Sequence, residues 1–224
     1  QDFLVELAQV KIGTEVLDHV PEDARLAAVE TLAAKDATNL EKLLKDAGVV
    51  AAERKRLLML CDLYGGRSVI GDARRRLRNA AAKRALDELE RVVDRLELAG
   101  FGDRVAIDLS DLRRHSYYTG VSMTLLAAGP GEPLGMGGRY DDLLSRYDAP
   151  APATGFAFEV DNVLWALSDA GVSLRGELPL RVVVAGGNYA RRSKTAALWR
   201  ERGARAAVIP AKSDNEAKQY AKAW

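Results

Sequence analysis

Cysteine and histidine are scarce in this sequence. Its 224 residues contain one cysteine, Cys61, and two histidines, His19 and His115. A single cysteine cannot form an internal disulfide, so we expect a cytoplasmic protein. Two isolated histidines without a cysteine cluster argue against the usual zinc-ligand spacings and against a histidine-based catalytic triad. We therefore predict no metal site and no cofactor, and we expect Cys61 to pack as a small hydrophobic side chain on a helix.

Charge of one sign and long apolar runs are also lacking. The 33 Lys and Arg residues balance 32 Asp and Glu residues, which excludes a strongly basic nucleic-acid binder as a description of the whole chain. No apolar run approaches the ~20 residues that span a bilayer, so we expect no membrane association. The chain begins at Gln1 without a methionine and ends on a helical pattern at Trp224. We expect it to be a piece of a longer protein.

Apolar residues recur at helical spacing from residue 4 to about residue 99. Asp36 is typical of a helix N-cap, and Gly48 of the residue that follows a helix. Short loops separate the apolar stripes. The pattern therefore predicts that residues 1–99 form a helical region.

The hydrophobic period changes from 3.6 to 2 at Gly100. Residues 104–109, 117–126 and 155–160 are predicted strands, and residues 139–144 resemble the start of a helix. Because no regular crossover helices separate the strands, residues 100–175 are predicted to form an antiparallel sheet. A linker at 176–179 precedes a β-α-β-α pattern, so residues 180–224 are predicted to be a partial α/β domain.

Three segments carry residues that are typical of binding or catalysis. The first, residues 113–120, is R-R-H-S-Y-Y-T-G; the second, residues 135–141, is G-M-G-G-R-Y-D; the third, residues 154–162, is T-G-F-A-F-E-V-D-N. Adjacent tyrosines on a strand would point to opposite faces, one into a pocket and one into the core. Glycines in the second segment allow close backbone approach, with Arg139 and Asp141 beside them.

Each segment also has a structural interpretation. The tyrosines could be ordinary strand aromatics, and Asp141 could lie in the first turn of a helix. Glu159 and Asp161 could form an acid–base pair, but acids that stabilise a helix N-terminus are the interpretation we favour.

Taken in order, the three segments resemble the catalytic core of class II histidyl-tRNA synthetases. The helical block before them is similar to that family's inserted helical region, and the piece after the linker resembles the start of its anticodon-binding domain. The resemblance covers most of the chain. It implies an α+β fold, with a class II synthetase-like antiparallel sheet, a helical insertion and the start of a small α/β domain.

Two positions of the third motif depart from the synthetase pattern G-F-A-x-G-L-E-R. Glu159 replaces a glycine against which the family places adenosine, and Asn162 replaces an arginine that binds ATP phosphate. A lost charge-assisted hydrogen bond costs about 1.5–3 kcal/mol, and a carboxylate adds bulk and like charge. Both departures predict that the ATP site is degenerate. The first motif also departs, since Arg114 and Ser116 stand where the family has glycine and aspartate.

A synthetase-like core without an ATP site resembles the regulatory subunits of ATP phosphoribosyltransferase, as does the stretch 60–66. That resemblance implies no catalytic activity of its own, a short-form catalytic subunit as partner, self-association as a homodimer or higher, and feedback inhibition of histidine biosynthesis by histidine. It places a remnant histidine site at Arg113, Ser116, Tyr117, Tyr118, Gly137 and Gly138. The alternatives are a histidine–tRNA ligase, or a fragment of one, and a separate synthetase-like module with another task.

Overall fold

The computed structural model describes all residues except 1–2, 78, 113–116, 173–179, 212 and 224. These residues form two compact units. One comprises residues 1–93 and 104–172, and the other comprises residues 94–103 and 173–224. The finer division into 1–99, 100–175 and 180–224 stays a prediction.

The first unit is built on a six-stranded sheet with the strand order β2-β3-β1-β4-β5-β6. All neighbouring strands are antiparallel except β1 and β3, which are parallel. The mostly antiparallel sheet confirms the predicted fold class. The strands are β1 (Phe3–Gln9), β2 (Tyr64–Gly65), β3 (Val105–Asp108), β4 (Val121–Ala127), β5 (Gly135–Arg139) and β6 (Thr154–Phe158).

The prediction of helix from residue 4 is wrong for the first strand. Residues 3–9 form β1, which lies inside the sheet between β3 and β4. Val5, Leu7 and Ala8 are all buried, because a central strand is covered on both faces. A strand buried on both faces is apolar at most positions and lacks a regular apolar–polar alternation, so its pattern does not distinguish it from the helix that follows.

Three other boundaries differ from the prediction. The strand expected from residue 117 begins at Val121, so Tyr117 and Tyr118 precede it. The strand expected to reach residue 160 ends at Phe158, and a helix begins at Val160. Residues 135–139 form β5, and the helix expected over residues 139–144 is replaced by a short 3-10 turn at Leu144–Tyr147.

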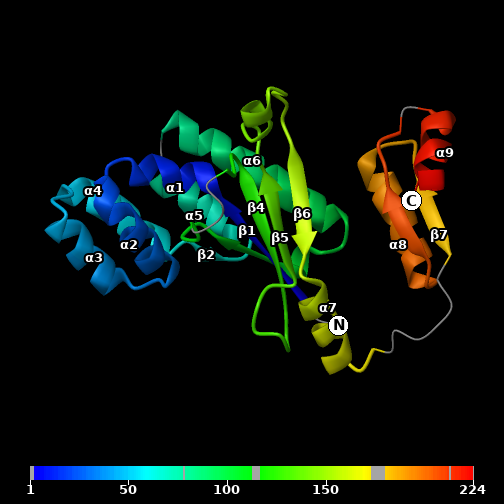
Figure 1. Cartoon of the computed structure of the whole chain (residues 1–224), viewed down its shortest axis with the longest axis horizontal. Helices are drawn as coiled ribbons and strands as arrows, with labels where there is room; N and C mark the ends of the chain where they lie inside the picture. Colours follow the sequence, from blue (N-terminus) through cyan, green and yellow to red (C-terminus); the bar gives the residue numbers. More distant parts are fainter. Residues whose placement is uncertain (1–2, 78, 113–116, 173–179, 212, 224) are drawn as a thin grey trace. The chain divides into compact units, whose positions relative to one another are not determined.

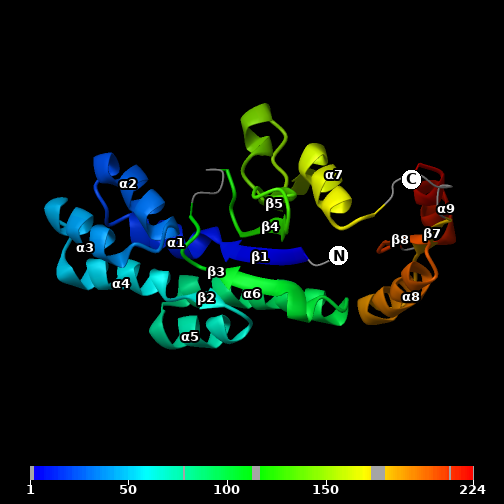
Figure 2. The same ribbon diagram turned by 90° about the horizontal axis from the view of Figure 1, so that it is seen from below.

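Helices gather at one end of the sheet and across one of its faces (Figures 1 and 2). The Asp36 side chain accepts a hydrogen bond from the Asn39 N–H at 3.0 Å, which confirms the predicted N-cap. Gly48 has φ +74°, a conformation that favours glycine after a helix. The helices of this unit are α1 (Val10–Leu17), α2 (Glu22–Ala33), α3 (Ala37–Asp46), α4 (Ala51–Cys61), α5 (Ser68–Arg76), α6 (Ala80–Leu98, as far as residue 93) and α7 (Val160–Asp169).

The hydrophobic core lies where these helices meet each other and the sheet. Leu32, Leu40 and Leu57 are fully buried between α2, α3 and α4, and Leu86 and Leu89 are fully buried on α6. α6 passes behind the strands in Figure 1 and alongside β1 in Figure 2. Burying such a side chain stabilises the fold by about 1.5–3 kcal/mol, so this leucine-rich core is what holds the sheet and helices together.

The second unit contains the parallel strands β7 (Arg181–Val184) and β8 (Arg205–Val208), connected by α8 (Tyr189–Glu201) and followed by α9 (Asp214–Ala223). Val184, Ala196 and Ala206 form its small core, with Trp199 packed against them. This is the predicted β-α-β-α order. Within the described residues, no helix is both long enough and apolar enough to cross a bilayer.

Candidate functional site

The two faces of the sheet have different surroundings. On one face, the buried side chain of Gln9 donates from Nε2 to the Ala85 carbonyl oxygen of α6 at 3.0 Å, so α6 covers this face. On the other face, Ser122, Gly138 and Gly155 lie side by side, because each is paired with the next across β4, β5 and β6. We call this second surface the glycine face.

Tyrosine rings occupy the space that the missing side chains leave on the glycine face. A Cβ on Gly138 would come within 3.1 Å of the Tyr118 ring, and a Cβ on Gly155 would overlap the Tyr140 hydroxyl. Tyr118 is only 6% exposed. The glycines are therefore needed so that these two rings can lie directly on the strands.

The three tyrosines form one aromatic cluster. The Tyr117 ring packs edge-on against Tyr118, with centroids 4.9 Å apart, and edge-on against Tyr140 at 5.7 Å. The prediction that Tyr117 and Tyr118 separate to opposite faces of a strand is wrong, because both precede the strand in an irregular segment. Offset and edge-on ring pairs contribute about 0.5–1.5 kcal/mol each, so the cluster fixes this segment against β5 and β6.

Arg139 connects the end of β5 to α6. Its Nε donates to both carboxylate oxygens of Asp141 at 2.9 and 2.8 Å, and its Nη1 donates to Glu88 at 2.7 Å. The Arg139 guanidinium lowers the pKa of Asp141, and hydrogen bonding to Asp141 raises the pKa of Arg139. The Asp141 N–H also donates to the Thr119 hydroxyl at 2.8 Å. Arg139 and Asp141 therefore hold the tyrosine segment in place.

Ser122 and Thr124 are residues of the glycine face that sequence reasoning missed. Both are buried, and among the described residues neither hydroxyl has a hydrogen-bond partner. An unpaired buried hydroxyl costs about 1–3 kcal/mol, so these groups are suited to hold a water molecule or a polar group of a ligand. Only the strand register, which sets Ser122 beside Gly138, reveals their position.

The predicted histidine-site residues are only partly brought together. Tyr117, Tyr118 and Gly138 lie at the glycine face, whereas Gly137 faces α6, where a Cβ would overlap the neighbouring strand and the Phe156 ring. Arg113 and Ser116 lie outside the described residues, as does His115. Histidine binding at this group of residues therefore stays a prediction.

The two positions predicted to make the ATP site degenerate lie where β6 passes into α7. Glu159 is the N-cap residue, exposed and still extended (φ −84°, ψ 97°), so it continues the alternation that puts Gly155 and Ala157 on the glycine face. Asn162 donates from Nδ2 to the Pro133 carbonyl oxygen at 2.9 Å. Asp161 lies in the first turn of α7, as the interpretation of helix-stabilising acids predicted.

The remaining titratable candidates lie apart from this site. Cys61 is half-buried at the end of α4, and burial raises the pKa of its thiol. His19 lies after α1, with its Nε2 3.8 Å from Glu53. Over the described parts of the chain, no three His, Cys, Asp or Glu side chains are grouped so that they could hold a metal ion.

Known proteins similar to this chain agree on one family. The model of the family described as histidyl-tRNA synthetase matches residues 1–163. A curated relative from Syntrophotalea carbinolica, named ATP phosphoribosyltransferase regulatory subunit, is 37% identical over 168 residues, covering 74% of this chain and 39% of that protein. One of the same name from Moorella thermoacetica is 35% identical, covering 100% of this chain and 57% of that protein.

A solved structure resembles the whole fold. It is described as an ATP phosphoribosyltransferase regulatory subunit/histidyl-tRNA synthetase from Bacillus halodurans C, with a TM-score of 0.65 and 26% identity over 98% of this chain and 57% of that one. The chain spans about half the length of the curated relatives it matches. Its sheet, its motif order and the match over residues 1–163 show that the chain belongs to the histidyl-tRNA synthetase family.

Proposed function

We propose that this chain is part of a regulatory subunit of ATP phosphoribosyltransferase, which supports the first step of histidine biosynthesis and its feedback inhibition by histidine. The curated relatives from Syntrophotalea carbinolica and Moorella thermoacetica bear that name. In this proposal the subunit catalyses no reaction itself. It acts by shifting a conformational equilibrium of a complex with a short-form catalytic subunit.

The observation that supports the proposal most strongly is that Glu159 and Asn162 stand where the synthetase motif has glycine and arginine. Glu159 ends the glycine face with a carboxylate, which repels a triphosphate, and its side chain does not cap α7. The Asn162 side chain is directed to the Pro133 carbonyl oxygen, and an amide cannot form the bidentate ion pair that a guanidinium forms with phosphate. A histidine–tRNA ligase needs the glycine and the arginine that its motif has at these two positions to activate histidine with ATP.

Two assays separate the proposed function from the ligase alternative. We expect no histidine-dependent ATP–pyrophosphate exchange from the full-length protein. We also expect it to co-purify with a short-form phosphoribosyltransferase from the same organism and to raise that partner's activity. Clear exchange would overturn the proposal in favour of the ligase. Failure of both assays would leave only the third alternative, a synthetase-like module with another task.

The remnant histidine site requires its own measurement. We expect calorimetric titration with histidine to show saturable binding, and Tyr118→Phe to weaken it, because the change removes the hydroxyl from a ring that lies at the glycine face. Tyr147→Phe is the matched control, since Tyr147 is 74% exposed. No heat at millimolar histidine would remove the histidine site from the proposal.

A further inference from the structure

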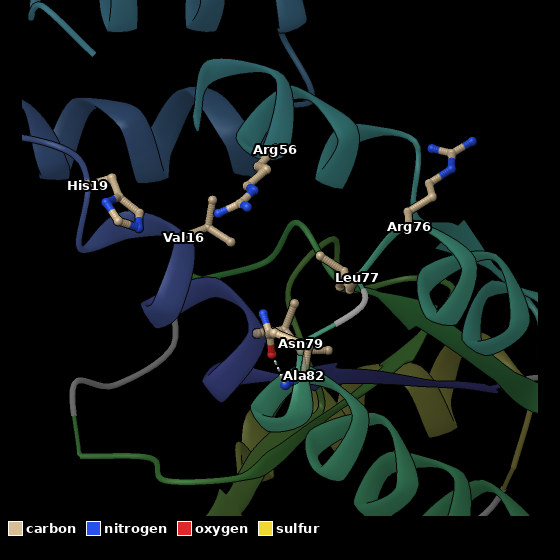
Figure 3. Close-up of a pocket in the computed structure, with 8 residues that line it drawn as sticks. Val16, His19, Arg56, Arg76, Leu77, Asn79 and Ala82 are labelled. Atoms are coloured by element: carbon tan, nitrogen blue, oxygen red, sulfur yellow. Dashed lines mark hydrogen bonds between the residues drawn. The ribbon is translucent and has the colours of Figure 1, made fainter. Parts of the chain in front are cut away.

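The helical part of the first unit contains a cavity that is separate from the glycine face (Figure 3). Its volume is about 270 Å³, close to the lower end of the ~300–1,000 Å³ that is usual for small-molecule sites. Side chains from α1, the segment after it, α4, the end of α5 and the start of α6 surround it. We call it the helical pocket; its lining residues are Ile12, Val16, His19, Arg56, Arg76, Leu77, Asn79 and Ala82.

One side of the helical pocket is apolar. Ile12, Val16, Leu77 and Ala82 line it, and each is no more than 6% exposed. Their positions are fixed because they belong to the core of the unit, where α1 and the start of α6 pack together. A preformed apolar wall of this kind favours the hydrocarbon part of a small ligand.

Arg56 supplies the polar side of the pocket. Figure 3 shows its side chain extending from α4 toward Val16, across the cavity from Asn79 and Ala82. Only Nη1 is engaged, by the two carboxylate oxygens of Glu53 at 3.1 and 3.2 Å. Among the described residues, Nε and Nη2 have no partner. These two nitrogens are parallel donors suited to a carboxylate.

The described groups around the cavity leave little unpaired negative charge beside it. Among the described lining residues there is no aspartate or glutamate. Glu53, the acid next to Arg56, is paired with Arg56 and lies 3.8 Å from His19. Arg76 contributes little, because its guanidinium points away from the cavity in Figure 3 and lies 3.6 Å from Asp62.

The start of α6 adds a weaker positive electrostatic potential to that of Arg56. The Asn79 side chain accepts a hydrogen bond from the Ala82 N–H at 2.7 Å, which places the first turn of α6 against the cavity. That turn contains no acidic residue. The partial positive charge of this helix N-terminus therefore adds to the preference for an anion, which rests mainly on Arg56.

We propose that the helical pocket binds a small aliphatic carboxylate. The carboxylate accepts hydrogen bonds from Nε and Nη2 of Arg56, and the branched apolar body lies against Ile12, Val16, Leu77 and Ala82. The volume of the pocket limits the ligand to a small molecule. The two nitrogens of Arg56 that have no partner among the described residues fit the carboxylate, and the buried apolar wall fits the hydrocarbon body. The site is independent of the proposed regulatory role.

Three probes test the ligand class. Methyl and amide NMR spectra of the chain are titrated with 4-methylpentanoate, with the neutral 4-methylpentanamide and with acetate. We expect 4-methylpentanoate to shift the methyl resonances of Ile12, Val16 and Leu77 with a Kd on the order of 1 mM. We expect the amide, which lacks the charge, and acetate, which lacks the apolar body, to bind at least about fivefold more weakly.

Arg56→Gln and Lys55→Gln test the role of the arginine. Arg56 is mostly exposed, so its replacement leaves the core intact, and Lys55 is the preceding residue on the same helix but is not among the described residues that line the pocket. We expect Arg56→Gln to weaken 4-methylpentanoate binding about fivefold or more and Lys55→Gln to leave it unchanged. Equal binding of acid and amide, equal effects of the two variants, or shifts confined to other residues would each overturn the proposal.

Discussion

The two halves of the six-stranded sheet are stabilised in different ways. In β1 and β3, Leu7 and Ile107 are completely buried between helices and neighbouring strands. In β6, every residue except Gly155 is exposed, including Phe158 at 59%. The first half is held by hydrophobic burial, and the second mainly by backbone pairing of β5 with β6, in which Gly135 and Gly137 lie opposite Phe158 and Phe156. The Ser122 and Thr124 hydroxyls, which have no hydrogen-bond partner among the described residues, lie on β4, between the two halves, and the tyrosine cluster packs beside them on Gly138 and Gly155.

Truncating a large side chain of the helix that covers the first half, and one in the second half, should show the largest difference. Leu89 is fully buried on α6 and Phe158 is exposed on β6. We expect Leu89→Ala to lower the free energy of unfolding by about 2–5 kcal/mol, because it leaves a cavity in the core. We expect Phe158→Ala to change it by less than about 0.5 kcal/mol. Urea denaturation of both variants measures the difference, and equal losses would contradict the comparison.

A side chain added between β5 and β6 should disrupt only the second half of the sheet. A Cβ on Gly137 would overlap the Gly155 carbonyl oxygen, and a backbone atom cannot move aside without separating the strands. We expect Gly137→Ala to cost about 1–3 kcal/mol and to speed amide hydrogen exchange in β6 more than in β1.

Gly66→Ala is the control for the Gly137 variant, because nothing lies within 4 Å of an added Cβ there. We expect it to leave β6 exchange unchanged. If Gly137→Ala left β6 exchange unchanged as well, close strand packing would not be what stabilises this half.

Two glycines in helices beside the first half of the sheet distinguish a tightly packed position from an open one. A Cβ on Gly13 in α1 would overlap the side chain of Leu112, whereas a Cβ on Gly71 in α5 would meet only the Arg75 side chain at 3.7 Å. We expect Gly13→Ala to destabilise by about 1–3 kcal/mol through overpacking. We expect Gly71→Ala to stabilise by about 0.5–1 kcal/mol, because alanine favours helix. Thermal unfolding of the pair should shift in opposite directions.

The Arg139–Asp141 pair should give the smallest effect, and one that depends on pH. Because Arg139 lowers the pKa of Asp141 in the folded state, the pair stabilises the fold above the unfolded carboxyl pKa of about 3.9. That contribution is lost as the pH falls through the lower folded pKa. We expect Asp141→Asn to be less stable than the parent at pH 7 and to match it in acid. A pH-independent difference would show that the ion pair is not its cause.

Sequence motifs contain most of the candidate site. The tyrosines, Gly138, Glu159 and Asn162 all belong to motifs that the family resemblance identified. The resemblance could not find Ser122 or Thr124, which match no motif and become notable only because the register sets them beside Gly138. It also could not separate Gly137 from Gly138, since their opposite faces follow from strand alternation.

By itself, the sequence determined the family, the helical character of most of residues 10–99, the helix caps at Asp36 and Gly48, and the β-α-β-α order of the second unit. These features depend on local periodicity and capping, which neighbouring residues encode. Only the tertiary structure decided that residues 3–9 form a central strand and that Tyr140 lies over Gly155. The helical pocket between α1, α4 and α6 also appears only there. Burial on two faces removes the alternation that marks a strand, and contacts between distant residues leave no local pattern.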